Sequence, residues 1–155
     1  MKIVSVILLT LFCNLADAQV QSVIVINNNI SIPMLLPTHY LNGNYVIISG
    51  AIQVSSDVTW QVSVRANGPL TFGPNQISQN NIGVDVTTPI GLQQPERFLT
   101  VSDQLIVDAA PNTYIGPINS PVLLDVKFRA IGGLDFFNKP SGSYSLTMTY
   151  TLAPD

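Results

Sequence analysis

The sequence is poor in the side chains that carry most enzyme chemistry. Its 155 residues include one cysteine and one histidine, and only 10% of them are charged. The cysteine, Cys13, lies in an N-terminal segment that we expect to be removed. The mature chain would then have no thiol for a disulfide, a redox centre or a thiolate metal site. These absences exclude much metal, redox and cysteine-based chemistry, and no cofactor is expected.

The N-terminal segment has the pattern of an export signal. Lys2 supplies the positive charge, residues 3–13 an apolar run, and residues 16–18 a small-x-small cleavage site, Ala-Asp-Ala. The apolar run is shorter than the ~20 residues that a membrane-spanning helix needs. We therefore predict a cleaved signal over residues 1–18 and a single domain over 19–155. The protein is expected in the periplasm, on the cell surface or outside the cell.

A second processing route for this segment is lipidation at Cys13, which would anchor the protein to a membrane. The residue before such a cysteine is usually small, whereas Phe12 is bulky. Cleavage after Ala18 is therefore the preferred prediction, and it leaves a mature chain without a transmembrane segment.

The charges are too few and too scattered for nucleic-acid binding. The chain has six Lys and Arg against nine Asp and Glu, a net charge of −3. Neutralising a phosphate backbone requires clustered cations, and only Lys127 and Arg129 are expected to share a strand face. The solvated surface must be mostly serine, threonine, asparagine and glutamine. Such a surface repels itself weakly, which permits close packing against a partner or a second copy.

Apolar and polar residues alternate with a period of two along most of the mature chain. The segments 45–55, 58–66 and 121–131 show this period, which is typical of half-buried antiparallel strands, and no helical period appears. Shorter runs bounded by glycine and proline lie at 20–26, 30–35, 69–72, 82–87, 97–101 and 104–108. We predict an all-β protein, an immunoglobulin-like antiparallel β-sandwich with Greek-key connections.

The titratable residues do not form a recognisable catalytic motif. His39 lies in a predicted loop, and the chain has no nucleophile elbow to serve it, so we interpret it as a surface histidine. Two carboxylate pairs are candidates for acid–base chemistry: Asp103 with Asp108, and Asp85 with Glu96. Isolated carboxylates at strand ends are usually solvated turn residues. The protein is therefore predicted not to be an enzyme, with no metal site.

Aromatic residues in or beside predicted loops offer a weak indication of glycan binding. These candidates are Tyr40, Tyr45, Tyr114 and Phe137. Exposed rings stack on sugars, but aromatic side chains more often serve packing. A carbohydrate-binding module is therefore an alternative function.

The most suggestive segment is the C-terminal one, which alternates regularly and carries no charge before its last residue. Its apolar series and the glycine before it are candidate edge-strand interaction residues: Gly142, Tyr144, Leu146, Met148, Tyr150 and Leu152. A strand of this kind at a sheet edge offers unpaired backbone groups and an apolar face to another chain.

On these residues the chain resembles bacterial pilin-like proteins of the chaperone–usher type. The resemblance rests on Gly142, Tyr144 and Tyr150 in the terminal strand, with residues 60–64 a weaker echo. It implies a pilin-like sandwich, secretion and a fimbrial or adhesive role. The chain departs from the family in lacking a disulfide and in having Pro154 at the penultimate position.

The leading hypothesis is therefore a secreted, non-enzymatic surface protein that is pilin-like or adhesin-like. It would act by self-assembly or by binding a protein partner through edge strands and loops. Residues 20–26 would either pair within their own domain or donate a strand to another subunit. A small outer-membrane β-barrel is a further alternative because its strands also alternate, although several predicted strands are too short.

Overall fold

The computed structural model describes residues 21–26, 30–89, 91, 93–108 and 121–154, and most of these form antiparallel β-strands. In that part of the chain, the larger sheet has five strands, in the order β1 (Gln21–Val25), β2 (Asn44–Ser56), β9 (Val122–Ala130), β6 (Ile82–Thr87) and β7 (Arg97–Phe98). The second sheet has three, in the order β10 (Met148–Pro154), β3 (Trp60–Ala66) and β8 (Gln104–Asp108). The remaining pair is β4 (Leu70–Phe72) with β5 (Asn75–Ile77). The prediction of a mainly β fold built from antiparallel sheets is confirmed.

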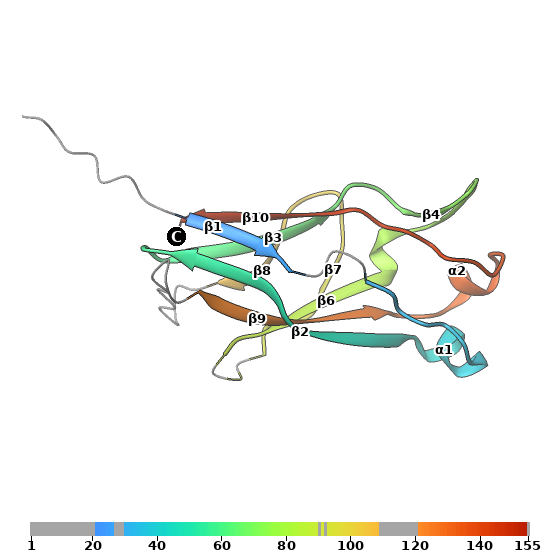
Figure 1. The fold of residues 1–155 in the computed structure, drawn as a ribbon. Coiled ribbons are helices and arrows are strands. Elements are labelled where there is room, and N and C mark those ends of the chain that lie inside the picture. The colour runs from blue at the N-terminus through green and yellow to red at the C-terminus, as the bar shows by residue number, and fades with distance from the viewer. Residues whose placement is uncertain (1–20, 27–29, 90, 92, 109–120, 155) are drawn as a thin grey trace, which may run out of the picture.

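The two larger sheets form two layers, with the hydrophobic core between them (Figure 1). Fully buried side chains come from both layers, and the largest of them are Trp60, Phe128, Ile52, Leu99 and Leu124. At one side of the molecule β1 lies beside β10, and at the other side β7 lies beside β8. The four edge strands of the two sheets therefore meet in two pairs.

The strand β9 shows how the alternating sequence selects its two faces. Val122, Leu124, Val126, Phe128 and Ala130 are all buried, as the period of two predicted. The residues between them point to the other side, which is the outer face of the five-stranded sheet. Because β9 pairs with β2 on one side and with β6 on the other, it forms the centre of this sheet.

The long strand β2 contains an irregularity at its middle. Ile48 pairs with Val126 and Ile52 with Leu124, so β2 has two more residues than β9 between these pairs. Gly50 lies in this segment with φ +62°, a conformation that favours glycine. Since an even number of residues is inserted, Ile48 and Ile52 keep the same orientation toward the core.

Three short helical segments lie among the described residues, although no helical period appears in the sequence. They are α1 (Pro37–Asn42), α2 (Leu134–Phe137) and the 3₁₀ turn η1 (Gln79–Asn81). Each is too short for a 3.6-residue period to appear in the sequence. Local features define them instead, such as Pro37 at the first turn of α1.

Residues 30–35 are corrected, because they form no strand. Ile30, Ile32 and Met34 pack against the core while the residues between them are exposed. The alternation is therefore present without a backbone ladder. Pro33 in the middle of the run lacks an N–H to donate, which disfavours pairing there.

Candidate functional site

The C-terminal strand β10 lies at the edge of the three-stranded sheet. It pairs with β3 from Met148↔Ala66 to Pro154↔Trp60, and no other described strand is hydrogen-bonded to it, although β1 lies alongside. Along an antiparallel edge strand, alternate backbone N–H and C=O groups point away from the sheet. The predicted edge position of this segment is therefore observed.

The candidate residues before Met148 do not belong to this strand. Gly142, Tyr144 and Leu146 precede it, and the regular strand is shorter than the predicted run 142–152. An isolated bridge between Ser145 and Thr71 attaches this part of the chain to β4 instead. The Tyr144 hydroxyl donates to the carbonyl of Pro140 at 3.1 Å, and its ring centroid lies 5.6 Å from that of Phe72.

Three candidate residues do lie in β10, and all three are half-buried. Met148, Tyr150 and Leu152 pack against the core. Burial also raises the pKa of the Tyr150 phenol, because the phenolate would lose its hydration. One face of β10 is thus anchored to the domain, while the backbone groups of its outer edge are hydrogen-bonded to no described strand.

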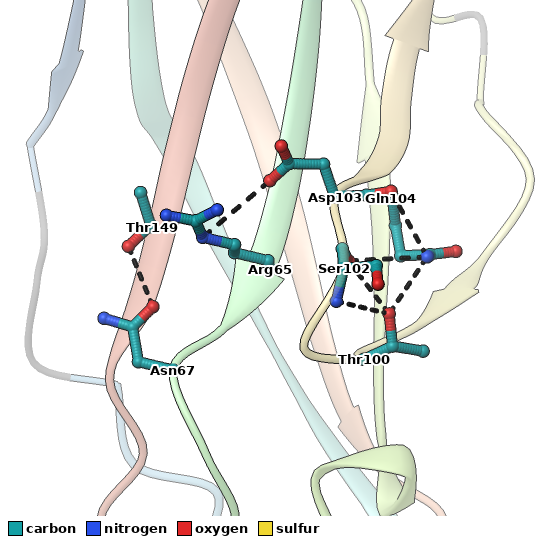
Figure 2. A network of polar contacts seen from close by, with 7 residues as sticks. All are labelled: Arg65, Asn67, Thr100, Ser102, Asp103, Gln104 and Thr149. Atoms are coloured by element: carbon teal, nitrogen blue, oxygen red, sulfur yellow. Dashed lines mark hydrogen bonds and ion pairs between the residues drawn. The ribbon is translucent and has the colours of Figure 1, made fainter.

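The outer face of the same sheet is covered by hydroxyl, amide and charged groups (Figure 2). The Thr149 hydroxyl of β10 donates to Asn67 Oδ1 at 3.0 Å, which ties the start of β10 to the end of β3. Arg65 Nε lies 3.9 Å from Asp103 Oδ1, and the Gln104 amide donates to Thr100 Oγ1 at 3.0 Å. The contacts in this network join residues of the same chain, so it holds the outer face of this sheet together.

The strand β1 pairs within its own chain, which is one of the two arrangements predicted for residues 20–26. Its register with β2 runs from Gln21↔Ser56 to Val25↔Ile52. β1 is the edge of the five-stranded sheet and lies alongside β10 (Figure 1). The buried Nε2 atom of Gln21 has no hydrogen-bond partner among the described residues.

The two sides of the molecule differ in charge at their edges. Neither β1 nor β10 contains a charged residue. On the opposite side, β7 contains Arg97 and β8 ends at Asp108. Charged side chains on edge strands oppose pairing with other chains. The side formed by β1 and β10 lacks this protection.

The aromatic glycan candidates do not form one platform. Tyr40 in α1 and Phe137 in α2 lie together at one end of the molecule, with ring centroids 5.8 Å apart. Tyr45 lies on β2, on the outer face of the five-stranded sheet, rather than in a loop. Tyr114 lies outside the described residues.

The titratable residues considered as catalytic candidates have local partners. His39 Nδ1 accepts a hydrogen bond from the backbone N–H of Leu35 at 3.2 Å. Asp85 is paired with Lys127, and Glu96 with Arg129. Within the part of the chain that the structure describes, no three potential metal ligands gather, and no helix is long and apolar enough to cross a membrane.

Sequence reasoning missed a polar and aromatic area on the outer face of the five-stranded sheet. The strand register brings Tyr45 beside Arg129, and Ile47 and Asp85 to either side of Lys127. The alternation predicted that Lys127 and Arg129 point outward, but their neighbours come from strands distant in sequence. Only the order of the strands shows which residues meet there.

Comparisons with protein-family models and with curated proteins find no match for this sequence. The class of the protein, one built mainly of antiparallel β-sheets, therefore comes from its fold, and the resemblance to pilins stays a prediction.

Proposed function

We propose that the protein is an exported, non-enzymatic surface protein that acts by adding a strand of another chain to the edge of β10. In this proposal the two layers form a pilin-like, immunoglobulin-like sandwich with Greek-key connections. The partner is a second copy or another protein of the same surface. The export signal over residues 1–18 and the low content of charge support this role.

The observation that carries the proposal is the uncharged edge of β10, whose outer side is hydrogen-bonded to no strand among the described residues. Its seven residues contain no Asp, Glu, Lys or Arg, and it lies beside the equally uncharged edge strand β1. An edge strand of this length presents a row of backbone donors and acceptors that an extended segment can satisfy. Half-buried Tyr150 holds the strand in place, so the edge is formed before a partner arrives.

The non-enzymatic part of the proposal is supported by the state of the candidate groups. Three of the four carboxylates considered for acid–base chemistry, those of Asp85, Glu96 and Asp103, lie in ion pairs. These contacts give the three carboxylates a structural role between neighbouring segments.

The proposal is tested by placing a lysine on each edge of the three-stranded sheet. Thr151 of β10 and Leu105 of β8 lie in one row across Ser63, and both are exposed. We expect the chain beginning at Gln19 to form concentration-dependent oligomers in analytical ultracentrifugation. Thr151→Lys should shift this distribution to monomers, whereas the matched control Leu105→Lys should leave it unchanged.

A monomer at all concentrations, with no partner retained at the cell surface, contradicts the proposal. An equal loss of assembly in the two lysine variants contradicts the assignment to β10. The export part is checked separately by the intact mass of the protein recovered outside the cytoplasm, which should correspond to a chain that starts at Gln19.

A further inference from the structure

A shallow pocket of about 330 Å³ opens on the outer face of the five-stranded sheet, away from the β1 and β10 edges. Tyr45 and Ile47 of β2, Asp125 and Lys127 of β9, Asp85 of β6 and Gln93 line it. The volume lies at the lower end of the range of small-molecule sites, about 300–1,000 Å³. The pocket therefore has room for a small ligand or for one unit of a longer one.

A buried carboxylate fixes the polar part of this pocket. Asp85 is only 4% exposed, and its Oδ2 accepts hydrogen bonds from Lys127 Nζ at 3.1 Å and from Gln93 Nε2 at 3.4 Å. Gln93 comes from the segment after β6 and is held by a bridge to Thr87. These three groups form a preorganised set of donors and acceptors, because each is positioned by another.

A second carboxylate is held by the irregular part of β2. Asp125 Oδ1 accepts the backbone N–H of Gly50 at 2.8 Å. Gly50 is the residue with φ +62° at the register shift, so the backbone of β2 turns an N–H toward β9 at this point. One hydrogen bond leaves the carboxylate with further acceptor capacity, since an ionised carboxylate offers about four lone-pair directions.

An open aromatic ring completes the pocket. Tyr45 is 56% exposed, and Lys127 Nζ lies 5.3 Å from the centroid of its ring. The ring and the fixed polar groups therefore face the same space. A pyranose matches this combination, because its C–H face packs on an aromatic ring while its hydroxyls both donate and accept hydrogen bonds.

The charge of the pocket selects among carbohydrates. Two carboxylates and one ammonium line it, and that ammonium already faces Asp85. The net charge repels phosphates, sulfates and uronic or sialic acids. We propose that this pocket binds a neutral hexose unit of a glycan, with Tyr45 as the stacking platform and Asp125, Lys127 and Gln93 as hydroxyl partners.

The test uses the purified protein with neutral and acidic sugars. Methyl glucoside, methyl galactoside, methyl mannoside and their oligosaccharides are titrated by saturation-transfer NMR, with sialyllactose as the acidic probe. Binding of at least one neutral sugar is expected, together with about a tenfold loss in Tyr45→Ala, since that variant removes the platform. Phe98→Ala is the matched control, because Phe98 is an exposed aromatic on the same sheet outside the pocket.

The variant Asp125→Asn distinguishes a neutral sugar from an acidic one as the ligand. Asparagine keeps an oxygen for the Gly50 N–H and loses the charge, so binding of a neutral sugar should weaken while binding of an acidic one would strengthen. No binding of any neutral probe, unchanged binding in Tyr45→Ala, or tighter binding of sialyllactose than of neutral sugars overturns the inference. The edge variant Thr151→Lys should bind the sugar normally, so this site and the assembly edge can fail separately.

Discussion

The carboxylate of Glu96 lies directly over Gly83 of β6. A methyl group on Gly83 would come within 2.5 Å of Glu96 Oε1. From this position Glu96 accepts hydrogen bonds from Arg129 Nε at 2.7 Å and from Arg129 Nη2 at 2.5 Å. Gly83 is the partner of Arg129 in the β6–β9 register, so the missing side chain in β6 is what lets Glu96 reach across to β9.

Gly83→Ala should therefore destabilise the protein by separating Glu96 from Arg129. The pair is partly exposed, so we expect a loss of about 1 kcal/mol in the free energy of unfolding, measured in urea. Gly68→Ala is the control, because no atom lies within 4 Å of its added methyl group. The cost of Gly83→Ala should shrink when Glu96 is already alanine, and an undiminished cost would show that the carboxylate is not what the methyl group meets.

The two faces of β9 give a second prediction from neighbouring leucines. Leu124 is fully buried and Leu123 is 48% exposed. Leu124→Ala should cost about 2–5 kcal/mol in the free energy of unfolding, because it leaves a cavity in the core. Leu123→Ala should stay within about 0.5 kcal/mol of the wild type. Both variants are measured by thermal and by urea unfolding. If Leu123→Ala and Leu124→Ala lowered the stability equally, the assignment of the two faces would be contradicted.

The contrast between these leucines also shows how far the sequence could predict the fold. A period of two assigns each residue of β9 to a face without any knowledge of its neighbours. It does not show whether a run finds a partner strand, which is why residues 30–35 alternate without pairing. It also misses burial by other segments: the alternation over 45–55 places Ser55 on the polar face, yet Ser55 is only 6% exposed. β1 lies beside it, since Ser22 is its partner.

The same limit applies to the candidate sites. The uncharged terminal strand could be predicted from its own residues, because its alternating pattern and its edge position both belong to one segment. The packing of the two sheets, which places uncharged β1 beside β10, could not be predicted in this way. The sequence points to Tyr45 only as an isolated ring, whereas its pocket is built from β2, β9 and the segment from β6 to Gln93, which are far apart in sequence. Its ligand-binding partners depend on tertiary structure.

Alkaline pH should destabilise the protein through Tyr150. Burial raises the pKa of its phenol above the ordinary value of about 10. Between the two pKa values the unfolded state has lost the proton that the folded state keeps, so the free energy of unfolding falls as pH rises above about 10. The expected slope approaches about 1.4 kcal/mol per pH unit for one proton.

This slope is measured by urea unfolding between about pH 8 and pH 11 in the wild type and in Tyr150→Phe, which lacks the titrating group. The variant should lose most of the alkaline slope. Tyr45→Phe serves as the control, because it removes an exposed phenol and leaves Tyr150 in place. The same slope in the wild type and Tyr150→Phe would assign the alkaline effect to other groups.

Replacing Lys127 and replacing Asp85, which form an ion pair, should lower the free energy of unfolding by different amounts. Asp85 is 4% exposed and the Lys127 side chain 27%, so only the lysine has ready access to water. Lys127→Met leaves a buried carboxylate with the Gln93 amide, and we expect a cost of about 2–3 kcal/mol in the free energy of unfolding. Asp85→Asn should cost less, because the ammonium can turn to solvent. The double variant should be more stable than Lys127→Met alone, since the buried charge is gone, and urea unfolding of the four proteins measures this. A double variant less stable than Lys127→Met would mean that the buried charge is not what makes the single change costly.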